Sequence, residues 1–174
     1  MQRLENLRSL SLELRELYLI DVRLNDMTAL QCLARLEVLV VTCVMVHFHM
    51  DGGVPTHNLA PLSHLRRLRH LDLSCTNLCD IQPLQHLDGL QYLNLSSTNV
   101  DDASPITALR RLEALLLHDT EIDALQGGSH CTRLREVSLP AQVDCTSVRR
   151  HAPFLRRLLH PEANCLWIGH ATGA

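Results

Sequence analysis

The sequence is poor in aromatic residues and contains no lysine. Aromatic residues make up 3% of the 174 residues, while hydrophobic residues as a whole make up 46%. The core must therefore be built from aliphatic side chains, and the chain is long enough for one domain with a substantial core. Every basic residue is arginine, whose planar group binds carboxylate and phosphate through paired hydrogen bonds. A GC-rich coding bias is the simpler explanation for the use of arginine in place of lysine.

The sequence also lacks a long apolar run and a strong net charge. The longest apolar candidate, Leu36 to Val46, is shorter than the ~18 residues of a membrane span and is interrupted by Glu37 and Thr42. The formal net charge of -3 attracts neither nucleic acid nor an anionic membrane as a whole. We therefore expect no membrane association.

The cysteines and the N-terminal segment bear on location. The seven cysteines include no Cys-x-x-Cys pair. Glu5 and Glu13 lie among the first leucines, which fits neither a secretory signal nor an acid-poor transit peptide. An odd number of cysteines in such a chain predicts reduced thiols. We expect an intracellular protein that is located in the cytoplasm. The alternative is a mitochondrial protein whose targeting segment is not part of the given sequence.

A leucine motif recurs along the chain. The pattern Leu-x-x-Leu-x-Leu, or a close variant, recurs at intervals of 22 residues, except for one interval of 32 and a last one of 21. It starts at Leu14, Leu36, Leu68, Leu90, Leu112, Leu134 and, in part, Leu155. Such a period predicts a solenoid of stacked coils. The motif resembles the 22-residue class of leucine-rich repeats, which is found in bacterial internalins and in a regulatory subunit of protein phosphatase 1. It is also similar to short repeat proteins of trypanosomatid protozoa.

Each repeat is expected to form one strand and one tight helical turn. Leu71 and Leu73 alternate with polar residues, which predicts a short strand with one buried face. Leu78, Ile81 and Leu84 recur at intervals of three, which predicts a 3-10 turn packed against the sheet. The predicted fold class is α/β: a leucine-rich-repeat solenoid of about six coils, with a curved parallel sheet on the concave side and short helical or 3-10 turns on the convex side.

We interpret residues 1–174 as a single domain. Its parts are an N-terminal cap (1–13), the repeats (14–154) with an insertion near 47–58, and a C-terminal cap (155–174) in which Trp167 covers the last coil. Thr76, Thr98 and Thr120 occupy the turn where the resemblance implies asparagine side chains that link adjacent coils. Threonine has one donor where asparagine has two, so we expect a weaker ladder of hydrogen bonds between coils.

The insertion is rich in histidine. His47, His49, His57 and His64, with Asp51, are candidates for a site that holds zinc, copper or nickel. Their spacing matches no recognised metal site, and a solvated loop that contacts a partner is the simpler interpretation. We therefore predict no metal and no other cofactor.

A catalytic site is not predicted. Cys79, Asp80 and His86 supply the residue types of a nucleophilic site, but nothing orients them as nucleophile, base and orienting group. Cys43 and Cys75 occupy the eighth position of adjacent coils, where a disulfide is geometrically conceivable, although two free thiols are the simpler interpretation. We expect neither enzymatic activity nor a small-molecule substrate.

The outward side chains of the strands form the candidate partner-binding surface, which we call the strand face. They are the third, fifth and seventh residues of each coil. The candidates are Tyr18, Ile20, Val38, Val40, His70, Asp72, Tyr92, Asn94, Ala114, Leu116 and His118. Apolar groups with aromatic residues are typical of protein interfaces. The sequence therefore predicts a non-catalytic interaction module, an adaptor or structural subunit of a larger assembly, unless a cap or the insertion covers the first group.

Arginines recur where each coil returns to its strand. The stripe consists of Arg66, Arg67, Arg110, Arg111 and Arg133, with Gly89 breaking the row. It predicts the alternative function, a peripheral subunit of a ribosome-like ribonucleoprotein complex that contacts RNA, or contact with an acidic partner. A solvated rim is the simpler interpretation. We also expect no aromatic stacking platform beside the stripe, which argues against single-stranded RNA.

Overall fold

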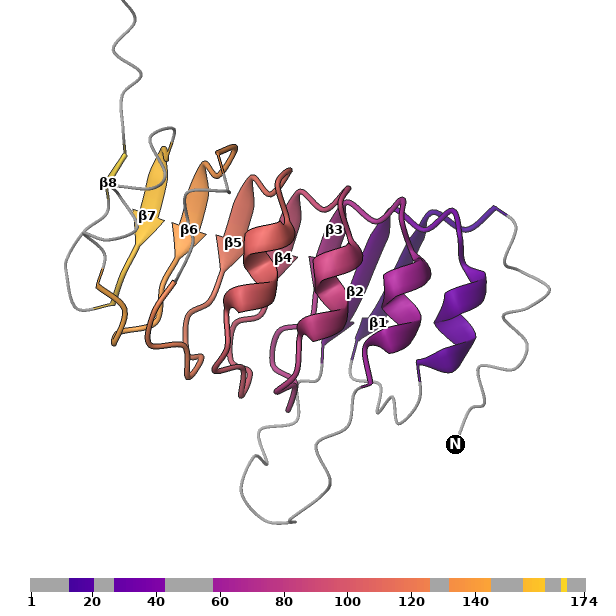
Figure 1. The fold of residues 1–174 in the computed structure, drawn as a ribbon, viewed down its shortest axis with the longest axis horizontal. Helices are drawn as coiled ribbons and strands as arrows, with labels where there is room; N and C mark the ends of the chain where they lie inside the picture. Colours follow the sequence, from indigo (N-terminus) through magenta and orange to yellow (C-terminus); the bar gives the residue numbers. More distant parts are fainter. Residues whose placement is uncertain are drawn as a thin grey trace, which may run out of the picture.

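The computed structural model describes residues 13–20, 27–42, 58–125, 132–144, 155–161 and 167–168. Its strands form a single row, with short helical turns along one side (Figure 1). The strands are β1 (Glu16–Ile20), β2 (Val38–Thr42), β3 (His70–Asp72), β4 (Tyr92–Asn94), β5 (Ala114–Leu116), β6 (Glu136–Ser138), β7 (Arg157–Leu159) and β8 (Trp167–Ile168). They are hydrogen-bonded in chain order.

Equivalent positions of the sequence repeat are neighbours in the sheet. Leu39 lies opposite Leu71, and Leu71 lies opposite Leu93. All three side chains are completely buried. β1 to β7 are parallel, so the predicted stack is confirmed and includes a strand from the partial repeat at Leu155. β8 pairs with β7 in the antiparallel sense, which ends the parallel row.

The buried core of the described residues is aliphatic. Its members are leucine, isoleucine, valine and alanine side chains together with Met27, and they form one continuous cluster. The scarcity of aromatic residues in the sequence correctly predicts this composition. A core of this kind joins neighbouring coils, because a single coil has too little apolar surface to be stable alone.

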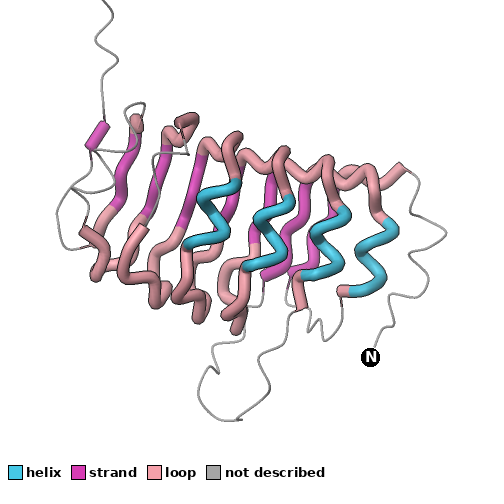
Figure 2. The backbone as a smooth tube through the Cα atoms, in the orientation of Figure 1, coloured by secondary structure: helices cyan, strands magenta, loops and turns pink. Residues whose placement is uncertain are grey.

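A period of three residues determines the helix type. The helical turns are η2 (Thr28–Cys32), η3 (Ala60–His64), η4 (Gln82–His86) and η5 (Ser104–Ala108), all of them 3-10 helices. The N–H group of Leu30 donates to the carbonyl of Met27 at 2.8 Å, and that of Leu33 donates to Leu30 at 2.9 Å. A 3-10 helix has three residues per turn, so these buried side chains project to the same side. Figure 2 shows the four turns on one side of the sheet.

A polar side chain begins three of these turns. Oδ1 of Asn58, Asp80 and Asp102 each accepts a hydrogen bond from the backbone N–H two residues later, at 2.9, 2.8 and 2.8 Å. These bonds satisfy N–H groups that have no partner inside the helix. The N–H and hydroxyl of Ser104 also lower the pKa of Asp102, because both stabilise its charged form. Three residues after Asn58, Asp80 and Asp102 the chain has a proline, which has no N–H group to satisfy. These prolines are Pro61, Pro83 and Pro105.

The threonines of the turns form hydrogen bonds within their own coil. The hydroxyls of Thr76, Thr98 and Thr120 donate to the carbonyl three residues earlier in their own coil, at 2.7, 2.6 and 2.8 Å. All three side chains are buried. The single hydroxyl hydrogen is therefore used within the coil and is not donated to a neighbouring coil, which agrees with the weaker ladder expected from the sequence.

Several predictions fall outside the described residues. They concern the segment before Glu13, His47, His49, Asp51 and His57 of the insertion, Cys43, and the side chain of Trp167. Within the described ranges, no helix is long and apolar enough to span a lipid bilayer.

Candidate functional site

The strand face is the surface of the sheet opposite the helical turns, and its apolar residues are exposed on β1. Tyr18 is 55% exposed and Ile20 is 58% exposed. In the next strand, Val40 lies opposite Tyr18, and both Val38 and Val40 are half-buried. In the part of the chain that the structure describes, neither a cap nor the insertion therefore covers this apolar group.

Two rings stack at the centre of the strand face. His70 of β3 and Tyr92 of β4 occupy the same repeat position and have their ring centroids 4.0 Å apart and their planes 2° apart. Burial lowers the pKa of His70, and nearby Asp72 partly opposes this effect. Burial raises the pKa of Tyr92, and the carboxylates of Asp72 and Glu136 raise it further. Both rings are therefore favoured in their neutral forms.

Asp72 and Asn94 form a hydrogen-bonded pair beside the rings. Asn94 Nδ2 donates to Asp72 Oδ2 at 3.1 Å. The second carboxylate oxygen of Asp72, Oδ1, accepts a hydrogen bond from the backbone N–H of Ser74 at 2.9 Å, and Oδ1 of Asn94 accepts one from the backbone N–H of Ser96 at 3.0 Å. Asn94 is only 9% exposed, so it differs from the other predicted contact residues. Its amide fixes the position of Asp72 and offers little surface to a partner.

The face continues over β5 with a second apolar group. Ala114 lies opposite Tyr92, and Leu116 lies opposite Asn94. Ala114 and Leu116 are half-buried, and His118 beyond them is exposed. The predicted contact residues on β1 to β5 thus lie in one continuous strand register, in which Asn94 is the buried member.

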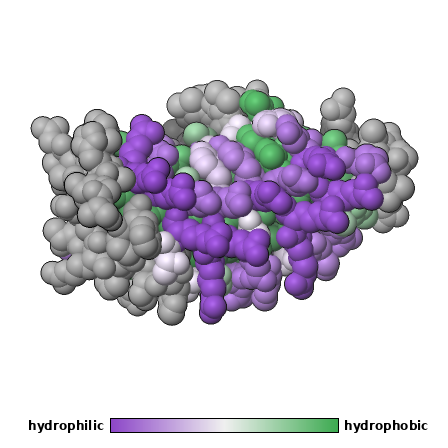
Figure 3. All heavy atoms as spheres, turned by 90° about the horizontal axis from the view of Figure 1, so that it is seen from above, coloured by the Kyte–Doolittle hydropathy of each residue, from purple (hydrophilic) through white to green (hydrophobic). Residues whose placement is uncertain are grey.

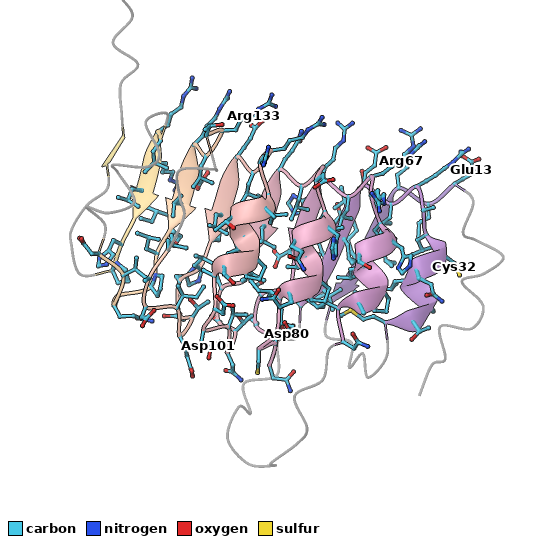
Figure 4. The ribbon with its side chains drawn as sticks, in the orientation of Figure 1. Glu13, Cys32, Arg67, Asp80, Asp101 and Arg133 are labelled. Carbon is cyan, nitrogen blue, oxygen red and sulfur yellow. The ribbon has the colours of Figure 1, made fainter. Side chains whose placement is uncertain are left out.

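Arginines gather along the edge where the strands begin, which we call the strand-start edge. It runs from two residues before the first leucine of each coil to the first residue of the strand. It contains every arginine of the described residues: Arg15, Arg35, Arg66, Arg67, Arg69, Arg110, Arg111, Arg133, Arg135, Arg156 and Arg157. Figure 4 shows Arg67 and Arg133 along the upper edge, with Asp80 and Asp101 along the lower one.

Ion pairs neutralise the two ends of the strand-start edge. Arg35 Nη1 lies 2.8 Å from Glu13 Oε1, and Arg15 Nη1 lies 3.5 Å from Glu37 Oε1. At the other end, Arg157 Nη1 lies 3.0 Å from Glu136 Oε1. Arg69 and Arg135 are not part of the predicted stripe, because that prediction uses only the positions before the first leucine. Both follow that leucine directly, so the same repeat register locates them.

The row is interrupted at Gly89 for a steric reason. A Cβ atom at this position would lie 3.3 Å from the carbonyl oxygens of both Arg66 and Leu68 in the preceding coil. A side chain at this position would require the backbone of the preceding coil to shift by a few tenths of an ångström. The gap in the arginine row therefore reflects the packing of two coils.

The described residues contain no cluster of three or more His, Cys, Asp or Glu side chains placed to hold a metal ion. His64, the described member of the predicted histidine set, is exposed, and its Nδ1 lies 3.4 Å from Ser63 Oγ. Cys79 Sγ donates to the Asn77 carbonyl at 3.6 Å. Neither contact provides the base that activates a nucleophile.

Solved structures of other proteins share this architecture. An internalin of Listeria monocytogenes matches 78% of this chain with a TM-score of 0.66 and 27% identity. The chain is a leucine-rich-repeat solenoid. Internalin C2 of the same species matches 90% of the solenoid and 75% of its own chain, with a TM-score of 0.62 and 23% identity. A plant peptide hormone receptor in complex with RGF2 matches 84% of the solenoid and 24% of its own chain, with a TM-score of 0.58 and 18% identity.

The similarity to these solved structures shows the fold of the chain, but it does not show to which subfamily of leucine-rich-repeat proteins the chain is related. The solenoid spans 37% of the first internalin's length. No family model and no curated protein matches the sequence. Leucine-rich-repeat domains are typically protein-interaction modules that use an extended strand surface. The finer resemblances to the phosphatase regulator and to trypanosomatid repeat proteins stay predictions.

Proposed function

We propose that the solenoid is a non-catalytic module that binds a protein partner through the strand face. The observation that carries this proposal is the exposure of Tyr18 and Ile20 beside Val38 and Val40. Burying one such side chain against a partner contributes roughly 1.5–3 kcal/mol. Aromatic residues with aliphatic neighbours are typical of the residues that dominate protein interfaces.

The centre of the strand face supports the same function. The stacked rings of His70 and Tyr92 and the bonded pair of Asp72 and Asn94 hold their side chains in fixed positions. A surface that is ordered before binding loses less conformational entropy in the complex. A plant peptide hormone receptor that was solved in complex with RGF2 shares this fold, which gives further support for binding a polypeptide.

The proposal includes an adaptor or structural-subunit role inside the cell. Cys32, Cys75 and Cys79 are exposed free thiols in the described part, which suits a reducing compartment. The cytoplasm is the proposed location.

The experiment compares partner recovery by wild-type solenoid and by variants, with quantitative mass spectrometry at low and at moderate salt. Ile20→Asp and Leu116→Asp place a charge in the two apolar groups, and we expect each to abolish recovery of the partner. The control, Gln85→Glu, adds the same charge at an exposed position of η4 and is expected to retain it. Equal recovery by all variants, or loss of the wild-type partner at moderate salt, contradicts the proposal.

A further inference from the structure

We propose that the strand-start edge is a second binding surface, which takes the phosphate backbone of a single-stranded nucleic acid. This surface is separate from the exposed apolar group of β1 and β2, although it borders the strand face at His70, Tyr92 and Ala114, and the inference does not depend on the partner that binds to the strand face.

The first observation is that the arginines of the described residues gather on one edge of the solenoid, where they outnumber the described carboxylates by eleven to six. All arginines of the described residues lie on the strand-start edge, whereas Asp80, Asp101, Asp102 and Asp123 are exposed on coil positions of the opposite edge. The net charge of -3 therefore conceals a strongly basic edge. A local field of this kind attracts and orients a polyanion regardless of the total charge.

The second observation is that the middle of the edge is not neutralised. Its exposed arginines, which form no ion pair with a described carboxylate, are Arg66, Arg67, Arg69, Arg110, Arg111, Arg133, Arg135 and Arg156. The described carboxylates between them are Asp88, Glu113 and Glu136, and Glu136 pairs with Arg157. Neighbouring strands are ~4.8 Å apart, so the arginines of β3 to β7 extend along ~19 Å. Repulsion among these cations decreases when phosphates bind between them.

The composition of the edge favours nucleic acid over an acidic protein. Seen from above, the described residues of this edge are hydrophilic for the most part (Figure 3). Protein interfaces generally contain an apolar core with aromatic anchors, whereas nucleic-acid interfaces are more polar and more basic. Arginine also binds phosphate through two parallel hydrogen bonds.

A pair of aromatic rings lies beside the basic edge, contrary to the expectation from the sequence. His70 and Tyr92 are the first residues of β3 and β4, and His70 directly follows Arg69. Proteins that bind single strands without sequence preference combine a basic track with rings on which bases stack. The neighbour of Tyr92 in β5 is the small Ala114, which leaves room beside the tyrosine for a planar base.

The test is fluorescence anisotropy with a labelled oligouridylate of about ten nucleotides and the full chain. We expect binding at low salt that weakens steeply as salt rises. Arg66→Gln/Arg67→Gln and Arg110→Gln/Arg111→Gln should each raise the Kd at least about fivefold and reduce the salt slope by about 1.4. Gln31→Glu/Gln85→Glu makes the same change in net charge at exposed positions of η2 and η4, and its Kd should stay within about twofold of wild type.

Three results overturn the proposal. They are no binding by the wild-type chain at low salt, equal affinity of the arginine variants and the control, and competition by polyglutamate as effective as that by unlabelled oligouridylate. The last result assigns the edge to an acidic protein instead. Circular dichroism checks folding, and Arg133→Gln provides a milder variant if a double variant unfolds. Ile20→Asp, which disables the strand face, should bind oligouridylate like wild type.

Discussion

His70 and Tyr92 stack face to face across two neighbouring strands, with their ring centroids 4.0 Å apart. The two residues hold the same position in successive coils, so the spacing of parallel strands places their rings at stacking distance. Burial in this stack lowers the pKa of His70 below its ordinary value. The stack therefore links the packing of the strand face to pH.

The stability of the solenoid should fall as the pH is lowered below about 6.5, because the unfolded chain binds a proton at His70 more readily than the folded chain does. The stabilisation by neutral His70 is fully present above the pKa that His70 has in the unfolded chain. It is lost as the pH falls through the lower pKa that His70 has in the folded chain. Urea unfolding of His70→Gln should show a weaker pH dependence than wild type. His118→Gln, an exposed change on the same face, is the control. An identical slope for His70→Gln and wild type refutes the prediction.

Gly89→Ala should lower the free energy of unfolding by about 1 kcal/mol, because its Cβ would lie 3.3 Å from two backbone oxygens of the preceding coil. Chemical denaturation measures the change. Asp88→Ala, an exposed neighbouring substitution, should alter the free energy by less than about 0.5 kcal/mol. If Gly89→Ala is as stable as wild type, the steric explanation of the gap in the arginine row is wrong.

Cys75→Gly and Asp119→Gly should each stabilise the fold by about 0.5–1 kcal/mol, since these residues have φ angles of 56° and 54°. Glycine adopts this left-handed conformation without the steric penalty of a Cβ atom. The thermal unfolding midpoint reports the gain. Asp101→Gly, at an exposed position with ordinary φ, should instead lower stability through the greater freedom of the unfolded chain. The opposite ranking of the variants is the contrary result.

Leu93→Ala should destabilise the solenoid by about 2–5 kcal/mol, because Leu93 is completely buried between Leu71 and Leu115 of the neighbouring coils. Each coil is stabilised mainly by its neighbours, so damage in a middle coil weakens two interfaces. Leu14→Ala, in the half-buried first coil, should have a smaller effect on the denaturation midpoint. Equal losses for the two variants argue against this nearest-neighbour description.

The sequence predicts those features that depend on periodic burial. The interval between leucine motifs identifies the parallel strands, and the period of three from Leu78 to Leu84 correctly predicts 3-10 geometry. Features that depend on short polar contacts are not accessible in this way. The local bond of Thr76 and the burial of Asn94 arise from side-chain rotamers and neighbours in the fold, which the repeat pattern does not encode.

The arginine row and the exposed apolar residues can be predicted from the sequence only in part. Arg69 and Arg135 share a repeat position, so a complete reading of the register finds them. The exposure of Tyr18 depends on whether another part of the chain lies over β1, which the periodicity of the sequence cannot decide.

Photo-crosslinking from position 18 tests the central claim most directly. A benzophenone amino acid replaces Tyr18, an exposed residue of the strand face, and the control carries it at Gln85 of η4. Irradiation of cells of the source organism should link a distinct protein to the chain from position 18, and Ile20→Asp should abolish that product. Crosslinks only from position 85, or none from position 18, contradict partner binding through the strand face.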